Sequence, residues 1–300
     1  MTRVDTAPVD RDALLARCTF PAPGTAVTAA VSGGPDSLAL LVLAVASGCE
    51  VTAVHVDHGL RAGSAREADV VAATAVALGA AFRAESVVVA PGPNLEARAR
   101  AARGAALPDD ACTGHTLDDR AETVLVNLLR GAGTTGMGAL RPGRRHPILA
   151  LRRSETAALC ASRGLVPVED PSNDDPRFVR NRVRHEVLPL LAEVAGRDLV
   201  PVLARQAGLL ADDADLLDTL GAELDPTDAA ALAAAPAPLA RAAVRAWLRP
   251  TADGQPPSAA AVERVRAVAA GDAVATEVPG GWRVRRSRGR LHLDPPSAPS

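Results

Sequence analysis

The sequence predicts an α/β protein with a doubly wound parallel sheet, followed by a smaller, mainly helical domain that ends in a β-hairpin. Two observations predict the sheet. Apolar runs of strand length alternate with helical patterns between residues 26 and 130, which is typical of parallel βαβ units. A Gly-rich turn also joins the first apolar run to the second, as in nucleotide-binding folds. A change of composition after residue 195 predicts the second domain.

The elements follow in order along the chain. The expected strands are short apolar runs at residues 26–31, 50–56, 82–89 and 111–114. The expected helices have helical apolar spacing and lie at residues 10–17, 38–46, 64–78, 94–107, 117–130, 179–195 and 259–270, with Ala-rich helices across 198–249. The segment 141–184 is expected to be largely irregular, and residues 275–293 to form two short strands. The predicted domains are residues 1–195 and 196–294, with a disordered tail at 295–300.

Composition narrows the class of protein. Three hundred residues allow one large domain or two of ordinary size, and 48% hydrophobic side chains are ample for a buried core. Since no apolar run approaches the ~20 residues of a membrane span and the first residues lack an apolar leader, a cytoplasmic protein is expected. The four cysteines are dispersed without a CxxC pair, which favours buried reduced thiols over a zinc or iron–sulfur site. The net charge of −2 argues against indiscriminate binding of polyanions.

The loop SGGPDS, residues 32–37, carries the first chemical signal. Gly33 and Gly34 allow the backbone to approach an anion, the hydroxyls of Ser32 and Ser37 add donors, and a helix is expected to begin near Ser37, after Pro35. The loop is not a lysine-containing P-loop, because the chain has no lysine. Asp36 would repel bare phosphate, so its expected role is to hold Mg²⁺. The alternative interpretation is a tight turn with a capped helix.

Two further groups of polar residues follow strands at the same predicted edge of the sheet. HVDHGLR ends the second strand and places His58 and Arg61 near the nucleotide. GHTLDDRAET follows the strand 111–114 and contributes four residues, His115, Asp118, Asp119 and Glu122. Asp118 and Glu122 share a helix face, and with Asp36 these carboxylates are expected to bind one or two Mg²⁺ ions. Simple helix capping is the alternative. Arg130, near the end of that helix, is expected to meet a phosphate.

The fourth group is EDPSNDDPRFVRNRVR, residues 169–184. Carboxylates followed by an arginine-rich helix suit a substrate that carries both an amine and a polyanion. A solvated loop with a salt-bridged helix is the alternative. The candidate substrate-binding residues of this group are Glu169, Asp170, Asn173, Arg180, Asn181 and Arg184.

SGGPDS resembles the pyrophosphate-binding loop of the AMP-forming ATP pyrophosphatases, the PP-loop family. The four segments together, in this order and over residues 24–192, resemble the tRNA(Ile)-lysidine synthetase branch of that family. The last segment is the most specific of the four. The helix after Glu96 departs from the branch, because Gly104 stands where a tyrosine is expected. The short C-terminal region is expected to be without the further RNA-binding domain of longer members.

The resemblance implies an ATP-dependent ligase that forms a C–N bond. The enzyme would adenylate the C2 oxygen of the wobble cytidine in the CAU anticodon of an isoleucine tRNA, and the ε-amine of free L-lysine would then displace AMP. ATP would be the co-substrate with Mg²⁺, bound by residues 32–37, His58, Arg61 and His115, and the catalytic residues would be Asp36, His58, Asp119 and Arg130. The tRNA would meet arginines at 141–153, 177–184 and 283–290. The oligomeric state is left open, with a homodimer among the options.

Two other functions are alternatives to the ligase. A tRNA sulfur-transfer enzyme would use the same adenylating loop, but it needs a cysteine pair or cluster. A nucleotide-binding regulatory protein would use the helical domain as a partner surface. The carboxylates at positions 36, 118, 119 and 122 argue against this second alternative, because a protein that only binds nucleotide does not need them.

Overall fold

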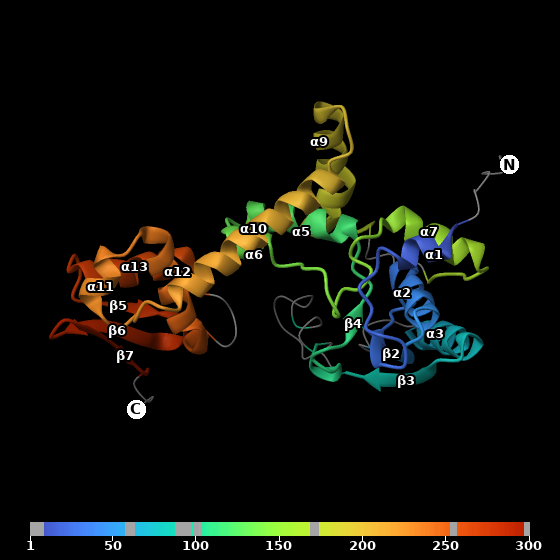
Figure 1. The fold of residues 1–300 in the computed structure, drawn as a ribbon, viewed down its shortest axis with the longest axis horizontal. Coiled ribbons are helices and arrows are strands. Elements are labelled where there is room, and N and C mark those ends of the chain that lie inside the picture. The colour runs from blue at the N-terminus through green and yellow to red at the C-terminus, as the bar shows by residue number, and fades with distance from the viewer. Residues whose placement is uncertain are drawn as a thin grey trace. The chain divides into compact units, whose positions relative to one another are not determined.

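The computed structural model describes residues 9–57, 64–87, 98, 102, 104–168, 174–252 and 257–296. The chain divides into two compact units, residues 1–209 and residues 210–300, each with its own core (Figure 1). The division predicted from sequence, after residue 195, falls at the end of a helix and stays a prediction about independent domains.

The first unit is built on a four-stranded parallel sheet. Its strands are β1 (Ala26–Ala30), β2 (Glu50–Asp57), β3 (Ala81–Ser86) and β4 (Cys112–Thr113). Their order is β3-β2-β1-β4, so the chain builds outward from β1 on one side and then returns to its other side. The carboxyl ends of β1 and β4 therefore flank the topological switch point, where open α/β sheets bind ligands.

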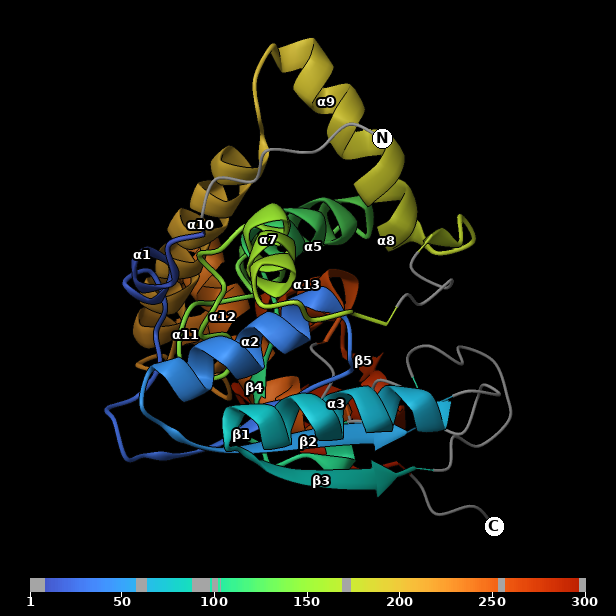
Figure 2. The same ribbon diagram turned by 90° about the vertical axis from the view of Figure 1, so that its right-hand side faces the viewer.

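Two helices pack over one face of this sheet, as Figure 2 shows. They are α2 (Pro35–Ala46) and α3 (Ser64–Leu78), which connect β1 to β2 and β2 to β3. Both crossovers run in the same direction across the sheet, and their right-handed sense places both helices on one face. Residues 37–44 of α2 are all buried, because α2 is enclosed by the sheet, α3 and α7 (Arg153–Ser162). The first core centres on α2. The short helix α1 (Arg11–Leu15) packs at its edge.

Further helices of the first unit carry the candidate site. They are α5 (Leu117–Leu129), α6 (Thr134–Met137), α8 (Val179–Arg182), a π-helical turn η2 (Val183–Val187) and α9 (Leu188–Ala195). The helix predicted at 179–195 is therefore present, with a π-helical turn in its middle. The prediction of irregular chain from 141 to 184 missed α7.

The second unit contains α11 (Ala229–Ala234), α12 (Ala237–Leu248), a 3-10 turn η3 (Arg249–Ala252), α13 (Ala259–Ala270) and a second 3-10 turn η4 (Pro279–Gly281). The long helix α10 (Val200–Gly221) contains the boundary between the units. Three antiparallel strands complete the second unit: β5 (Ala275–Val278), β6 (Trp282–Ser287) and β7 (Arg290–Asp294).

The sequence predicted two strands in this region, whereas three are present because both of its Gly-containing segments reverse the chain. Gly280 and Gly289 have φ of 75° and 79°, which glycine adopts readily. In the part of the chain that the structure describes, no helix is long and apolar enough to cross a membrane.

Candidate active site

The loop of residues 32–37 leaves the carboxyl end of β1 and opens α2. Gly33 has a φ of 87°, and its carbonyl accepts a 3.0 Å hydrogen bond from the backbone of Val168. The Ser37 hydroxyl closes the loop, since it accepts from Ser32 N at 3.1 Å and donates to Gly34 O at 2.9 Å. The Ser32 side chain is exposed at the start of α2, and a helix N-terminus of this kind attracts anions.

The start of α5 lies directly against this loop. β4 pairs with β1 through Thr113 and Ala30, which brings the segment after β4 beside the segment after β1. A Cβ atom on Gly114 would lie 2.8 Å from the carbonyl oxygen of Asp36 and 3.0 Å from Cα of Ser37. Only a residue without a side chain allows this approach, so Gly114 sets the distance between the loop and α5.

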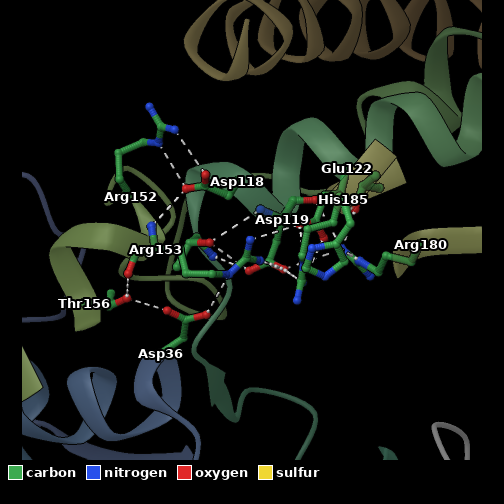
Figure 3. Close-up of polar contacts among 12 residues, drawn as sticks. Asp36, Asp118, Asp119, Glu122, Arg152, Arg153, Thr156, Arg180 and His185 are labelled. Atoms are coloured by element: carbon green, nitrogen blue, oxygen red, sulfur yellow. Dashed lines mark hydrogen bonds and ion pairs between the residues drawn. The ribbon is translucent and has the colours of Figure 1, made fainter. Parts of the chain in front are cut away.

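Asp36 lies in the first turn of α2, and its side chain points toward Thr156 and Arg153 of α7 (Figure 3). The Thr156 hydroxyl donates to one of its oxygens, and Arg153 Nε lies 3.5 Å from the other. Burial raises the pKa of Asp36 to about 6, even though Thr156 and Arg153 both act to lower it. The ionised carboxylate is thus held at an energetic cost, which is typical of functional sites.

Asp119 has two roles, and one of them is the capping role considered from sequence. It completes a capping box, because its Oδ2 accepts from Thr116 N at 2.8 Å and from Thr116 Oγ1 at 2.9 Å. Its Oδ1 accepts from Arg153 Nη2 at 3.0 Å. Burial alone would raise the pKa of Asp119, but the charges of Arg153 and Arg180 outweigh it and lower that pKa. Asp119 is therefore a stable anion beside Asp36.

Glu122 is fully buried and is surrounded by three arginines. Its Oε1 lies 3.0 Å from Arg153 Nη1 and 2.7 Å from Arg184 Nε, while its Oε2 lies 3.0 Å from Arg180 Nε. A buried carboxylate is tolerated only with such partners. Asp119 and Glu122 thus share the Arg153 guanidinium as a partner.

Asp118 is the second residue of α5. It accepts from Arg152 Nε at 3.1 Å and from Arg153 N at 2.9 Å, which joins the start of α5 to the start of α7. Arg152 also pairs with Asp198. The arginines at 152 and 153, expected to meet tRNA phosphate, therefore bind carboxylates of their own chain.

The predicted Mg²⁺ ligands fit the ion unequally. Asp36 and Asp119 are neighbouring carboxylates at the phosphate-binding loop, and Mg²⁺ typically uses one or two carboxylates together with phosphate oxygens. Both oxygens of Glu122 accept from guanidinium groups. The oxygens of Asp119 likewise accept from Arg153 and Thr116, so metal ligation by either carboxylate would require these partners to be displaced. Within the described residues, no three His, Cys, Asp or Glu side chains form a metal-binding group by themselves. The donor set thus fits an ion that Asp36 shares with a bound nucleotide.

His115 belongs to a small network at the end of β4. The Thr113 hydroxyl lies 2.7 Å from His115 Nδ1 and 2.8 Å from His146 Nδ1, and the two rings meet edge to face. Burial lowers the pKa of His146 to about 4, and the charge of His115 adds to this effect. His146 is thus a neutral support for His115 near neutral pH.

Two predicted residues are not brought to the loop. Arg130 ends α5 eleven residues after Asp119, which places it about 17 Å along the helix from that carboxylate. Asn181 is buried, and its amide donates to the carbonyl of Asp175 at 2.9 Å. Five further candidates lie outside the described residues, namely His58, Arg61, Glu169, Asp170 and Asn173.

Sequence reasoning missed Arg153, Thr156 and His146 as parts of this site. Arg153 was counted as one of a basic run, and Thr156 and His146 stand in no motif. A signal was present for Arg153, because a cation in the first turn of a helix faces the positive end of the helix dipole and needs another reason to be there.

A cavity of about 210 Å³ opens beside the acidic cluster. One side is charged, with Glu122, Asp118 and Asp198 as anions and Arg153 and Arg184 as cations. The other side is apolar, and its residues are Leu188, Pro189, Ala192, Leu199 and Val200. The cavity is smaller than the roughly 300–1,000 Å³ of a drug-sized site, and its lining suits a charged molecule with an aliphatic chain.

Comparison with known proteins agrees with the motifs. Residues 11–191 match the model of the PP-loop domain, and residues 228–292 match that of the TilS substrate binding domain. A tRNA(Ile)-lysidine synthase from Nocardia farcinica is 43% identical over 300 residues, covering 91% of this chain and 93% of the relative. The synthases of Mycolicibacterium paratuberculosis and Rhodococcus erythropolis are 47% and 45% identical, and each alignment covers 73–75% of both chains.

One solved structure shares the fold. The U34-tRNA thiolase NcsA from Methanococcus maripaludis, determined with its [4Fe-4S] cluster, superposes with a TM-score of 0.55 at 16% identity. The superposition covers 67% of this chain and 78% of the thiolase. At this identity the likeness concerns the arrangement of the sheet and helices.

Proposed function

The chain belongs to the tRNA(Ile)-lysidine synthase family, and we propose that it ligates L-lysine to C2 of the wobble cytidine in the CAU anticodon of isoleucine tRNA. ATP is cleaved to AMP and pyrophosphate in this reaction. The observation that carries the proposal is the contact of Gly114 with the backbone of Asp36, which joins the phosphate-binding loop to a buried cluster of carboxylates and arginines. An ATP-dependent ligase needs both parts in one place.

The first step is adenylation. The cytidine O2 attacks the α-phosphorus of ATP, an O–P bond forms, and pyrophosphate leaves. We propose that the exposed Ser32 hydroxyl and the amide groups at the start of α2 bind the leaving group. Asp36 would hold Mg²⁺, with Asp119 beside it, and the bound ion would neutralise phosphate charge. His115, supported by Thr113 and His146, is proposed to contact the nucleotide.

The second step is attack by lysine. Its ε-amine forms a bond to C2 while the C2–O2 bond breaks, AMP leaves with the former O2, and the nitrogen loses its protons. We assign the lysine to the 210 Å³ cavity beside α5. The apolar wall suits the aliphatic chain, the anionic residues suit an ammonium group, and Arg184 suits the carboxylate. This combination of charged side chains with an apolar wall is what supports free lysine as the nucleophile.

The tRNA is proposed to bind through exposed arginines. In the second unit, Arg283 and Arg288 are exposed and have no ion-pair partner among the described residues. Arg285 and Arg290 are paired with Asp294 and Asp225. Arginine contacts to phosphate give affinity without a need for stacking side chains, of which this chain has few. A tRNA substrate also supports a cytoplasmic location.

Sulfur transfer is a less well supported function for the same fold. Burial raises the pKa values of Cys18, Cys112 and Cys160 to about 11, so these thiols are poor nucleophiles. Cys112 and Cys160 moreover donate to the carbonyls of Arg144 and Pro35. A regulatory protein that only binds nucleotide would not need the Asp36 carboxylate, whose burial makes its ionised form unfavourable.

The test is to incubate the protein with ATP, Mg²⁺, labelled L-lysine and an isoleucine tRNA transcript with a CAU anticodon. Lysine incorporation that requires ATP and disappears when the wobble cytidine is replaced by uridine would establish the reaction. AMP release without incorporation would keep the adenylation and reject lysine as the nucleophile. No AMP release would reject the ligase.

A further inference from the structure

Arg153 contacts carboxylates from two parts of the site, the loop of residues 32–37 and helix α5. Its three guanidinium nitrogens each meet a different carboxylate: Nε lies 3.5 Å from Asp36, Nη2 lies 3.0 Å from Asp119, and Nη1 lies 3.0 Å from Glu122 (Figure 3). Asp36 belongs to the phosphate-binding loop and the other two to α5. Arg180 and Arg184 also bind the α5 carboxylates, but neither pairs with Asp36 within the described chain.

The position of Arg153 is unfavourable for the helix that carries it. It is the first residue of α7, where the helix dipole disfavours a cation. Its side chain is only 26% exposed, and burial by itself would lower the pKa of Arg153. The three carboxylates outweigh burial and raise that pKa, so they hold the guanidinium in place. Neither the stability of α7 nor solvation explains an arginine here.

Arg153 also lines the cavity that we assign to lysine, together with Glu122 and Arg184. Its guanidinium thus borders the nucleophile's cavity and at the same time contacts the carboxylate of the adenylating loop. A planar fork with fixed donor directions can hold three carboxylates at set distances, which a lysine ammonium cannot do equally well.

We propose that Arg153 is a positioning residue that couples adenylation to lysine transfer, by holding Asp36 and the α5 carboxylates in one arrangement. The inference rests on the proposed function. With the arrangement intact, the amine reaches the adenylated cytidine before water does. With it loosened, water attacks instead, AMP is released, and the cytidine carbonyl is restored. The ratio of AMP released to lysine incorporated therefore rises above one.

The test compares wild type with Arg153→Lys, using the tRNA transcript, ATP and saturating lysine. We expect a ratio near one for wild type and a ratio of about 3 or more for Arg153→Lys, with lysine incorporation reduced on the order of 10- to 100-fold. The matched control is Arg17→Lys, which makes the same chemical change at a residue that binds Glu155 on the same helix, outside the acidic cluster. Its ratio should stay near one.

Two results would overturn the inference. Both are ratios for Arg153→Lys that equal that of wild type: in one the two rates are unchanged, and in the other AMP release and lysine incorporation fall by the same factor, as expected of a purely structural residue. If Arg153→Lys does not fold, the test uses Arg153→Ala with and without added guanidinium ion. If Arg153 couples the two steps, free guanidinium should lower the ratio of AMP to lysine toward one. If it does not, the ratio should stay unchanged. A wild-type protein that incorporates no lysine would instead reject the proposed function.

Discussion

The backbone of Gly114 lies so close to that of Asp36 that a Cβ at residue 114 would come within 2.8 Å of the Asp36 carbonyl oxygen. The nearest atoms belong to the main chain, so a clash at residue 114 could not be relieved by rotating a side chain. It joins the end of β4 to the loop after β1 across the switch point of the sheet.

Gly114→Ala is expected to lower the rate of AMP formation on the order of 100-fold, because the loop must move by a few tenths of an ångström to about 1 Å. The rate is measured with tRNA and ATP at saturation. Gly104→Ala is the matched control, since nothing lies within 4 Å of a Cβ there, and in a helix this change should stabilise by about 0.5–1 kcal/mol. Equal activity of the two variants would show that the Gly114 contact is unimportant.

Asp36→Ala is expected to abolish AMP formation and to leave the affinity for tRNA nearly unchanged. The reason is that Asp36 faces Thr156, Arg153 and the nucleotide loop, and we assign it to metal and not to RNA. Filter binding of labelled tRNA and release of AMP measure the two properties. A parallel loss of tRNA binding would contradict this assignment.

Asp36→Asn is expected to stabilise the fold at pH 8 by on the order of 3 kcal/mol. The folded-state pKa of Asp36 is raised from 3.8 to about 6, so the ionised carboxylate costs stability. That cost is fully present above pH 6, decreases as pH falls through 6, and is absent below 3.8. Denaturant unfolding at several pH values measures it, with the exposed Asp213→Asn as control. A gain that does not vary with pH would point to another cause.

Glu122→Gln is expected to destabilise the protein by about 3–5 kcal/mol, because three arginines lose their shared buried anion. Thermal and denaturant unfolding measure the change. The control is Glu186→Gln, which removes an exposed partner of Arg182 and should cost no more than about 0.5 kcal/mol. Comparable effects of the two substitutions would mean that the buried cluster contributes little to the fold.

Binding of tRNA is expected to weaken steeply with salt, because arginine contacts to phosphate release counterions. Arg283→Gln should reduce the slope of log K against log salt by about 1. Arg285→Gln should change it less, since Asp294 already compensates that charge. A slope near zero for wild type would reject recognition through phosphate.

The sequence alone determined the order of the parallel α/β elements, the loop at residues 32–37 and the family resemblance. These are local patterns: apolar runs of strand length, a Gly-rich turn, and motifs whose chemistry depends on a few neighbouring residues. The family was confirmed by relatives that are 42–47% identical. The third strand of the second unit and helix α7 were missed, because their ends depend on turns and charges that a local pattern does not weigh.

Only the tertiary structure decided which charges meet. In sequence, Arg153 stands 117 positions after Asp36 and within a basic run that suggested RNA phosphate. In the fold it turns inward, because burying Asp36, Asp119 and Glu122 without a cation would cost far more than placing an arginine at a helix start. The direction of a charged side chain follows from the burial of its partners, and burial is a property of the folded chain.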